Sequence, residues 1–398
     1  MSQTSKIQFL SFLPLLLNSV ALLSVIWIIV PAPAYNVWLF SVVASEWSLW
    51  LGALALIGII CCLFNRDGNL WLVSLAVGII ALIISLYPFF SVVEVARKQN
   101  VSLSLSRYFN GLFRTGDFSK ADTKNFTTYT FAQIDEKDLQ LDVYLPTQDT
   151  ANNGAGLIVI HGGSWNAGER NDFPQWNAMF AAEGFTVFDV DYRLVQPNYL
   201  TATGDVKCAV KWVKENAVKF RISPDRIALL GRSAGGHLAL LAAYSAGDAR
   251  LPASCSETPT IENVRAVVSV YAPTDLLWAY DNPANGRVIN GPQTLANFLG
   301  GSPHESVEIR ERYILASPVS RIASNTPPTL LIHGGQDQLV RPENMNLLAG
   351  KLKEANAPHK TLFISYAQHG FDYNFNGWGA QISKAAILNF LRDNTQQR

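Results

Sequence analysis

Residues 227–235 read Ile227-Ala228-Leu229-Leu230-Gly231-Arg232-Ser233-Ala234-Gly235, and an apolar helical pattern continues to residue 244. The short apolar run predicts a buried strand, and the following pattern predicts a helix. Ser233 therefore stands at a sharp strand-to-helix turn with a glycine two positions away on each side. Glycine permits the close backbone approach that such a turn needs, and a serine held there projects its hydroxyl away from the sheet. Turns without a chemical role share this pattern, so other motifs in the chain are needed to decide whether Ser233 has one.

The first quarter of the chain contains three long uncharged segments. No charged residue occurs between Lys6 and Glu46, from 47 to 65, or from 68 to 93. Each segment is long enough for a membrane-spanning helix. Buried helices of a soluble domain are the weaker interpretation, because such helices rarely lack charge on every face. We place the three spans near residues 7–30, 47–64 and 70–90.

The charges that flank these segments predict the orientation. Lys6 and Arg66 on the inner side give a chain that crosses three times and leaves its C-terminal part outside the cytoplasm. Residues 32–34 (Ala-Pro-Ala) resemble a signal cleavage site, and a cleaved chain that crosses twice gives the same result. Basic residues after the third span argue for the opposite orientation, but long domains translocate largely regardless of such charges. The sequence predicts an integral membrane protein whose C-terminal domain is non-cytoplasmic.

Charge and cysteine content exclude some classes of function. The formal net charge is zero and no basic run occurs, so nothing indicates nucleic-acid binding. The four cysteines lack the spacing of a metal site, so we expect no metal. Two of them fall in the soluble part, Cys208 and Cys255. An oxidising compartment permits a disulfide between them, but a cysteine pair in a domain of this size is more often free and buried, which is our expectation.

The C-terminal part alternates between strand and helix patterns. After a polar linker over 95–125, residues 126–398 form one predicted domain, which begins with a hairpin over 127–134 and 139–145. Short apolar runs then alternate with helical stretches, as in a mostly parallel sheet with helices on both faces. The runs are 157–160, 186–190, 227–230, 264–271, 329–332 and 361–365. The helical stretches are 173–183, 204–220, 234–244, 343–355 and 378–392.

Residues 275–317 interrupt this alternation between two strands. We expect this excursion to lie over the carboxyl edge of the sheet, where ligands bind in open α/β folds. It carries Trp278 and Tyr280, which are candidates for the wall of a substrate pocket. The equally favoured alternative is that these aromatic side chains only pack the excursion onto the domain.

A serine nucleophile needs a base, and the base needs an acid that orients it. Of the six histidines, His369 is the one that follows the last predicted strand in a loop at the sheet edge, so we assign it as the base. Asp337 follows the preceding strand and gives the chain order Ser, Asp, His. Asp275 is the rival acid, but it leads into the excursion, and Asp372 is too close to His369 in sequence.

Acyl transfer also needs donors for the oxygen that becomes negative. The loop His161-Gly162-Gly163-Ser164-Trp165 follows an early strand and can direct backbone N–H groups into the site. We assign the N–H groups of Gly163 and Ser164, together with that of Ala234 after the serine, as the oxyanion hole. Trp165 joins the candidate pocket residues.

With these motifs the segment from about residue 126 to 391 resembles the esterase/lipase branch of the α/β-hydrolases, close to hormone-sensitive-lipase-like and feruloyl-esterase-like carboxylesterases. The resemblance implies an α/β-hydrolase fold, preceded here by about three transmembrane helices (residues 1–94) outside the resemblance. The elbow of that family often carries Asp or Ser where this chain has Arg232. The matching segments are HGGSW (161–165), DYRL (191–194), 205–212, PDRI (224–227) and HGGQDQLV (333–340).

The leading hypothesis is a membrane-anchored serine hydrolase that cleaves carboxylic esters through Ser233, His369 and Asp337, with an acyl-enzyme intermediate and no cofactor. Its expected partners are the membrane and a small-molecule ester, which membrane anchoring would allow to be lipophilic. Amide cleavage by a formamidase-like or peptidase-like enzyme is the first alternative. A catalytically inactive hydrolase fold used for binding is the second.

Overall fold

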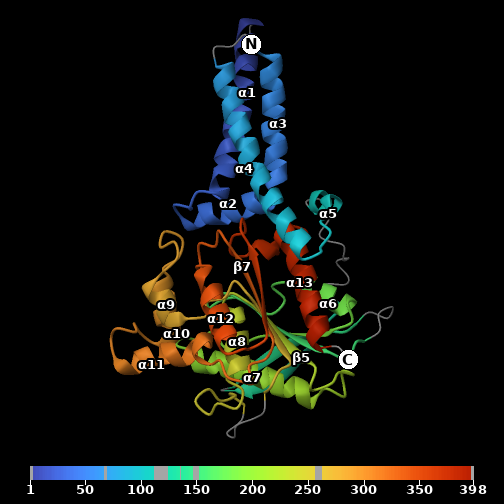
Figure 1. The fold of residues 1–398 in the computed structure, drawn as a ribbon, viewed down its shortest axis with the longest axis vertical. Helices are drawn as coiled ribbons and strands as arrows, with labels where there is room; N and C mark the ends of the chain where they lie inside the picture. The colour runs from blue at the N-terminus through green and yellow to red at the C-terminus, as the bar shows by residue number, and fades with distance from the viewer. Residues whose placement is uncertain are drawn as a thin grey trace.

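The computed structural model describes residues 3–66, 70–111, 124–134, 136–146, 152–255 and 262–395, with side chains from residue 12 onward. A narrow helical bundle, formed by the N-terminal quarter, stands on a wider α/β domain along the long axis of the molecule (Figure 1). We call these parts the bundle and, after the fold that the sequence predicts, the hydrolase domain.

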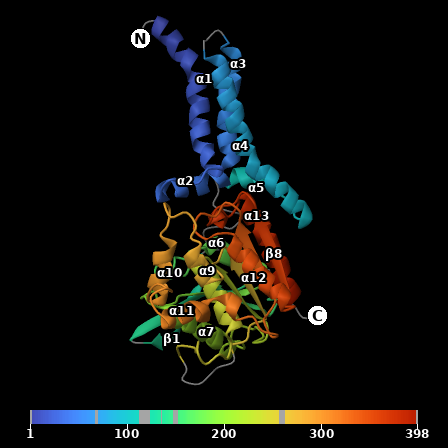
Figure 2. The same cartoon turned by 60° about the vertical axis from the view of Figure 1, so that its left-hand side comes forward.

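Three helices run alongside one another in the bundle, and a fourth lies across its base (Figure 2). The crossing helix α2 is bent by 80° from the helix that follows it. A short 3-10 helix (Ile26–Ile28) precedes α2. The long helices are α1 (Gln3–Val25), α3 (Ser48–Phe64) and α4 (Trp71–Lys98), and the crossing helix is α2 (Tyr35–Glu46).

The side chains inside the bundle are mostly small and include polar ones, whereas those on its outside are large and apolar. Asn18 is buried and donates from Nδ2 to the backbone oxygen of Ser74 at 2.8 Å. A Cβ atom on Gly58 or Gly78 would lie within 3 Å of the Asn18 side chain, so these helices approach closely there. Close packing through small residues with apolar residues outside is typical of helices in a bilayer. The exposed apolar residues include Phe12, Leu16, Leu23, Ile57, Ile60, Leu72, Ile79, Ile83 and Phe90.

Helix length decides which parts of the bundle qualify as membrane spans. Among the described residues, α4 is the one helix that is long and apolar enough to cross a membrane on its own. The pair α2 and α3 meets that requirement only if the bent pair is one span, and the described apolar stretch Phe12–Ile28 is shorter. Three separate spans are therefore not established by length and composition.

The stretch that we predicted to be a linker, residues 95–125, is partly helical. Helix α4 continues to Lys98, and α5 (Leu105–Asn110) also falls within the stretch that we expected to be a linker. Tyr108 of α5 stacks on Trp378 of the hydrolase domain with ring centroids 4.2 Å apart, and its hydroxyl accepts the N–H of Leu49 at 3.1 Å. The first part of this stretch therefore packs against both domains. Residues 112–123 of the stretch lie outside the described residues.

The hydrolase domain contains an eight-stranded sheet in the order β1-β2-β4-β3-β5-β6-β7-β8. Strands β1 and β2 form the predicted antiparallel hairpin, β2 pairs antiparallel with β4, and the remaining pairs are parallel, as the alternating pattern predicted. The strands are β1 (Thr127–Ile134), β2 (Lys137–Tyr144), β3 (Gly156–Ile160), β4 (Thr186–Val190), β5 (Ile227–Arg232), β6 (Ala266–Val270), β7 (Thr329–Gly334) and β8 (His359–Ile364).

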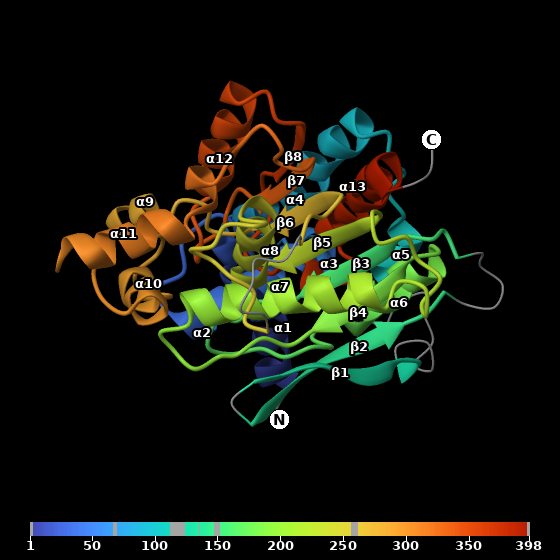
Figure 3. The same cartoon turned by 90° about the horizontal axis from the view of Figure 1, so that it is seen from below.

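Helices cover both faces of this sheet (Figure 3). Alternate residues of β3 point to opposite cores: Ile158 and Ile160 belong to one, and Leu157 and Val159 to the other. This alternation explains why the strands read as continuous apolar runs, because both of their faces are buried. Helices α7 (Tyr199–Glu215), α8 (Ala234–Tyr244) and α12 (Glu343–Glu354) pack on the first core, and α6 (Pro174–Ala182) and α13 (Trp378–Thr395) on the second.

The carboxyl edge of the sheet faces the bundle (Figure 1). Two contacts establish this arrangement. Tyr366, just after β8, donates its hydroxyl to Glu46 at the end of α2 at 2.9 Å. Gln338, just after β7, accepts the N–H of Ala32 at 2.7 Å. Any site at this edge therefore lies next to α2.

The predicted excursion forms three helices beside this edge, α9 (Leu276–Asp281), α10 (Gly291–Leu299) and α11 (Val307–Ala316). Polar side chains cap their first turns: Asp275 accepts the N–H of Trp278 at 3.0 Å, and Ser306 accepts that of Ile309 at 3.1 Å. These caps fix where the helices begin.

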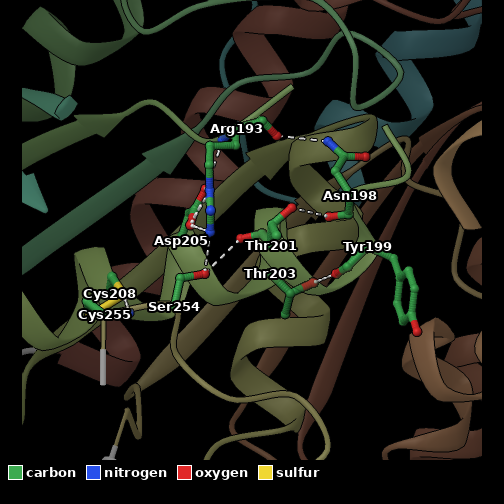
Figure 4. Close-up of polar contacts among 9 residues, drawn as sticks. All are labelled: Arg193, Asn198, Tyr199, Thr201, Thr203, Asp205, Cys208, Ser254 and Cys255. Atoms are coloured by element: carbon green, nitrogen blue, oxygen red, sulfur yellow. Dashed lines mark hydrogen bonds and ion pairs between the residues drawn. A yellow bond between two sulfur atoms is a disulfide. The ribbon is translucent and has the colours of Figure 1, made fainter. Parts of the chain in front are cut away.

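The expectation that Cys208 and Cys255 are free is wrong, because the structure joins them in a disulfide with Cα atoms 5.8 Å apart. Figure 4 places this bridge beside a polar network. Arg193 pairs with Asp205 at 2.7 Å and donates to Ser254 at 2.8 Å. Sequence spacing could not predict the bridge, because it depends on how α7 meets a loop 47 residues later.

Removing the bridge should lower stability without removing activity. The double variant Cys208→Ser/Cys255→Ser is expected to lose about 2–4 kcal/mol of unfolding free energy, because the unfolded chain loses a cross-link over 47 residues. Thermal melting in detergent measures the change, with Cys61→Ser as the matched control. Equal melting of the two variants would contradict the prediction.

Asp189 is a buried carboxylate of β4 that should make stability depend on pH. Its Oδ2 accepts the N–H of Asn171 at 2.8 Å and Nδ2 of Asn177 at 2.6 Å. Burial raises the pKa of Asp189 to about 7 despite these bonds. As pH rises from about 4 to about 7 the unfolded chain ionises this group while the folded chain does not. Folding therefore loses up to about 4 kcal/mol from this group over that window.

Asp189→Asn should remove this penalty. The carbonyl oxygen of the new side chain can take the place of Oδ2 and still accept from the N–H of Asn171 and from Nδ2 of Asn177. We expect the difference in melting temperature, variant minus wild type, to increase as the pH is raised from 5 to 8. Asp225→Asn, at an exposed position, is the control and should change nothing. A constant difference across this pH range would refute the raised pKa.

Candidate active site

Ser233 sits at the turn between β5 and α8 with φ 54° and ψ −122°. A Cβ atom on Gly231 would lie 2.1 Å from the backbone oxygen of Gly235, and one on Gly235 would lie 2.2 Å from the oxygen of His161. Neither position accepts a side chain, which is why glycines flank the serine at this spacing. The N–H of Ser233 donates to Val270 of β6 at 2.9 Å and ties the turn to the neighbouring strand.

His369 lies in the loop after β8 and contacts the serine directly. Its Nε2 is 2.9 Å from Oγ of Ser233, and its Nδ1 is 2.7 Å from Oδ2 of Asp337. The ring packs against Tyr271, with centroids 4.4 Å apart. The structure thus brings the three predicted residues into one hydrogen-bonded chain.

The carboxylate of Asp337 is buried in the loop after β7, where three hydrogen-bond donors hold it beside the imidazole of His333. Its Oδ1 accepts the N–H groups of Leu339 and Val340, both at 2.9 Å. Its Oδ2 accepts from His369 and lies 3.2 Å from Nε2 of His333. Burial alone would raise the pKa of Asp337, but the two neighbouring imidazoles hold it well below its usual range. The carboxylate is therefore ionised at neutral pH.

The other histidines serve different contacts. His161 stacks on Tyr192 at 4.3 Å, and His304 pairs with Asp281 at 2.8 Å. His237 is buried between Trp165 and the backbone oxygen of Ala316, and burial lowers its pKa to about 4. None of these rings faces Ser233 in the described chain.

Asp275, the rival acid, caps the first turn of α9 through its hydrogen bond to the N–H of Trp278. His333 is the residue that sequence reasoning missed, although it is the first residue of the HGGQDQLV segment. Its place four residues before Asp337 was the available signal.

The loop after β3 turns sharply beside the serine. Gly163, Ser164 and Trp165 all have positive φ, of 102°, 52° and 60°. Ala234 is the first residue of α8, where the N–H groups have no helical partner. Ser164 and Ala234 line the same cavity as Ser233.

This cavity has a volume of ≈ 60 Å³ and lies between the serine and the excursion. Trp165 lines it and stacks on Phe298 of α10 with centroids 4.2 Å apart. Further lining residues include Pro273, Ala279, Asn282, Ile289, Leu295 and Leu339. The walls are therefore mainly apolar.

The prediction that Trp278 and Tyr280 line the cavity needs correction. Ala279 and Asn282, three residues apart on one face of α9, line it instead. Tyr280 packs edge-on against Tyr313 at 5.6 Å, and the ring of Trp278 lies 5.4 Å from the guanidinium of Arg341. Trp278 thus packs the excursion onto the domain, which was the alternative, whereas Tyr280 packs within the excursion.

Arg232, next to the serine, points away from the cavity. Its Nε donates to Asp372 at 2.5 Å, and its guanidinium lies 4.0 Å from the ring centre of Phe173. Tyr271 also donates to Asp372, at 2.6 Å. Strand alternation explains the direction, because adjacent side chains leave a strand on opposite faces. Within the described chain, no three His, Cys, Asp or Glu side chains form a group that could hold a metal.

The model of the BD-FAE family matches residues 141–352, which is more than half of the chain. The chain belongs to the BD-FAE family. This membership confirms the predicted resemblance to the esterase branch of the α/β-hydrolases. The match begins in β2, so the bundle lies outside it.

Curated relatives of this BD-FAE domain include two proteins of Mycobacterium tuberculosis. Esterase LipC is 30% identical over 240 residues, covering 58% of this chain and 57% of the relative. The probable carboxylic ester hydrolase LipM is 29% identical over 245 residues, covering 58% and 53%. The chain spans about half the length of the curated relatives it matches.

Solved structures share the fold of this BD-FAE domain. Esterase Est2 of Thermogutta terrifontis has a TM-score of 0.54 and 24% identity, covering 68% of this chain and 93% of that protein. Its propionate-bound form gives a TM-score of 0.55 with 22% identity, covering 69% and 97%. These likenesses confirm the α/β-hydrolase fold.

Proposed function

We propose that this BD-FAE family protein is a serine esterase that hydrolyses small-molecule carboxylic esters. The observation that carries the proposal is the unbroken hydrogen-bonded chain from Ser233 through His369 to Asp337, whose serine borders an apolar cavity. Esterases among the family relatives support the same chemistry.

In the proposed reaction Oγ of Ser233 attacks the ester carbonyl while Nε2 of His369 takes the hydroxyl proton. Asp337, already ionised, stabilises the imidazolium and keeps Nδ1 protonated. The imidazolium then gives its proton to the departing alcohol, leaving an acyl-serine. Water, deprotonated by His369, attacks this ester and releases the carboxylic acid and the free serine.

The oxyanion that forms in both steps needs donors opposite the nucleophile. We assign this role to the N–H groups of Gly163, Ser164 and Ala234, and the positive φ values of the first two support the assignment. Ala234 adds the positive end of the α8 dipole. Losing one such donor typically costs about 10²–10³ in kcat.

The cavity supports a short acyl group. The cavity beside Ser233 is small, with a volume of ≈ 60 Å³, and its walls are mainly apolar, which favours a short acyl chain. We expect kcat/KM to be highest for acetate to butyrate esters and to fall toward palmitate.

We further propose that α1, α3 and α4 anchor the protein in a membrane, with α2 at the interface. The small-residue interior and apolar exterior of the bundle support three spans, although α4 alone satisfies the length requirement. The exposed side of α2 carries Tyr35, Leu39, Phe40 and Val43. In this arrangement the carboxyl edge of the sheet faces the bilayer, so lipophilic esters would reach the site from the membrane.

We place the hydrolase domain on the non-cytoplasmic side. The Cys208–Cys255 disulfide supports that side, because disulfides persist in oxidising compartments. Alkylation of the native chain in cells, before and after reduction, tests the placement. Reduced cysteines in intact cells would argue for a cytoplasmic domain.

The test of the enzymatic proposal uses the full chain in detergent. p-Nitrophenyl esters from acetate to palmitate are compared with p-nitroanilides of the same acids, and a p-nitrophenyl phosphonate provides a covalent probe. We expect ester turnover and one phosphonyl adduct on the peptide that contains Ser233. Preferential anilide turnover would favour an amidase, and an unlabelled, inactive chain would refute the proposal.

A further inference from the structure

A four-residue strap connects the first bundle helix to α2. We define the strap as residues 31–34, Pro-Ala-Pro-Ala. Ala32 is 1% exposed and stands between two prolines, which have no N–H to donate. Its own N–H and C=O are both bound by side chains of the hydrolase domain. Gln338 accepts the N–H at 2.7 Å, and Asn285 donates to the C=O at 2.7 Å.

Gln338 is the centre of this junction. Its Oε1 accepts from Nδ2 of Asn285 at 2.8 Å as well as from Ala32, and its backbone oxygen accepts the N–H of Asn285 at 3.1 Å. Its Nε2 donates to Oε1 of Gln368 at 3.2 Å. One side chain therefore joins the strap, the excursion and the loop after β8.

The positions of these partners in the chain connect the junction to the site. Gln338 directly follows Asp337, and Gln368 directly precedes His369. Leu339, the next residue, lines the cavity and packs against the cluster of Ala32, Trp38 and Val288. The acid loop, the base loop and one cavity wall thus share a contact with the strap, which lies outside the family match.

We propose that the strap positions the acid and base loops of the esterase site, with Gln338 as the positioning residue. The inference rests on the proposed esterase function. Gln338 acts through Asp337 and Gln368 and does not touch the reacting atoms. If the contact with Ala32 is broken, the buried Oε1 of Gln338 loses a hydrogen-bond donor. The acid and base loops beside Gln338 are then held less firmly in position. Misplacement of a catalytic group by about 1 Å can cost about 10² in rate.

The test compares Gln338→Met with the wild-type full chain in detergent. Methionine keeps the length of the side chain and removes all its hydrogen bonds. We expect kcat on p-nitrophenyl butyrate to fall about 10–100-fold while KM changes less than about threefold, because transition-state alignment is lost and the cavity remains. Phosphonate labelling of Ser233 should slow by a similar factor.

Rescue distinguishes positioning from general packing. Gln338→Glu keeps an acceptor for Ala32 and Asn285, and the amide of Gln368 can turn to donate to it. We expect its kcat at neutral pH to lie clearly above that of Gln338→Met.

The matched control is Gln381→Met. Gln381 is also buried, and its Oε1 accepts the N–H of Ser104, 277 residues away, at 2.8 Å. Its Nε2 donates to the backbone oxygen of Asn376 at 2.9 Å. The control therefore removes an equivalent contact between the N-terminal region and the hydrolase domain, away from the acid loop. We expect a similar fall in melting temperature and a kcat within about twofold of wild type.

A second pair of variants tests the strap itself. Ala32→Pro removes the N–H that Gln338 accepts, whereas Ala32→Gly keeps it. We expect Ala32→Pro to lose part of the kcat that Gln338→Met loses, and the double variant to be no worse than Gln338→Met, because Gln338→Met already removes the hydrogen bond that Ala32→Pro removes.

The outcomes separate the two proposals. An active wild type with an unchanged Gln338→Met kcat overturns the positioning role. Equal kcat losses in Gln338→Met and Gln381→Met also overturn it, since they would reflect stability alone. A wild type with neither turnover nor labelling overturns the esterase proposal and this inference with it.

Discussion

Ser233→Ala is expected to lower kcat on p-nitrophenyl butyrate by about 10⁶-fold. The mutation removes the hydroxyl oxygen placed 2.9 Å from Nε2 of His369, so Ser233 can no longer form an acyl-enzyme. The remaining rate would come from water bound beside the imidazole and the oxyanion donors. Stopped assays with long incubation in detergent measure the residual rate, and the phosphonate adduct should disappear.

The matched control for this variant is Ser269→Ala. Ser269 is buried on β6 and donates to the backbone of Gly236 at 3.3 Å, so its replacement disturbs a neighbouring strand without touching the reacting atoms. We expect this variant to keep kcat within about threefold and to keep the adduct. Wild-type turnover by Ser233→Ala would mean that another group attacks the ester.

Asp337→Asn is expected to cost about 10⁴-fold in kcat while leaving the fold intact. The new carbonyl oxygen can still accept the N–H groups of Leu339 and Val340, which places the amide nitrogen against His369. Nδ1 must then accept a hydrogen bond, so the proton moves to Nε2. An imidazole that donates toward Ser233 cannot take its proton, and the base is lost.

The rival carboxylate supplies the control. Asp275→Asn keeps an acceptor for the N–H of Trp278 at the start of α9, so both stability and kcat should change little. If Asp275→Asn lost more activity than Asp337→Asn, the assignment of the acid would be wrong. Melting temperatures of both variants show whether a loss of activity reflects a loss of folded protein.

Local sequence carries enough information to place most of the hydrolase domain. Apolar runs such as 157–160 and 186–190 became β3 and β4 because each strand is buried on both faces, and burial on both faces is visible in the composition. The glycines around Ser233 were readable because a Cβ at either position would overlap the backbone. The order of strand ends likewise placed His369 and Asp337 at one edge.

Contacts between segments that are far apart in the chain could not be predicted from the local sequence. Nothing near Ala32 indicates that its N–H binds Gln338, 306 residues away. Trp278 and Tyr280 had the composition of a pocket wall, but the rotation of α9 directs Ala279 and Asn282 into the cavity instead.

The sequence by itself therefore determined the alternation of strands and helices, the turn that holds Ser233, and the identity of the three residues that meet there. It did so because burial, turn geometry and strand order are local properties. The tertiary structure alone decided the Cys208–Cys255 bridge, the side of the hydrolase domain that faces the bundle, and the junction at Gln338. Those features are pairings of side chains across the chain, and only the packed fold brings their partners within hydrogen-bonding or covalent distance.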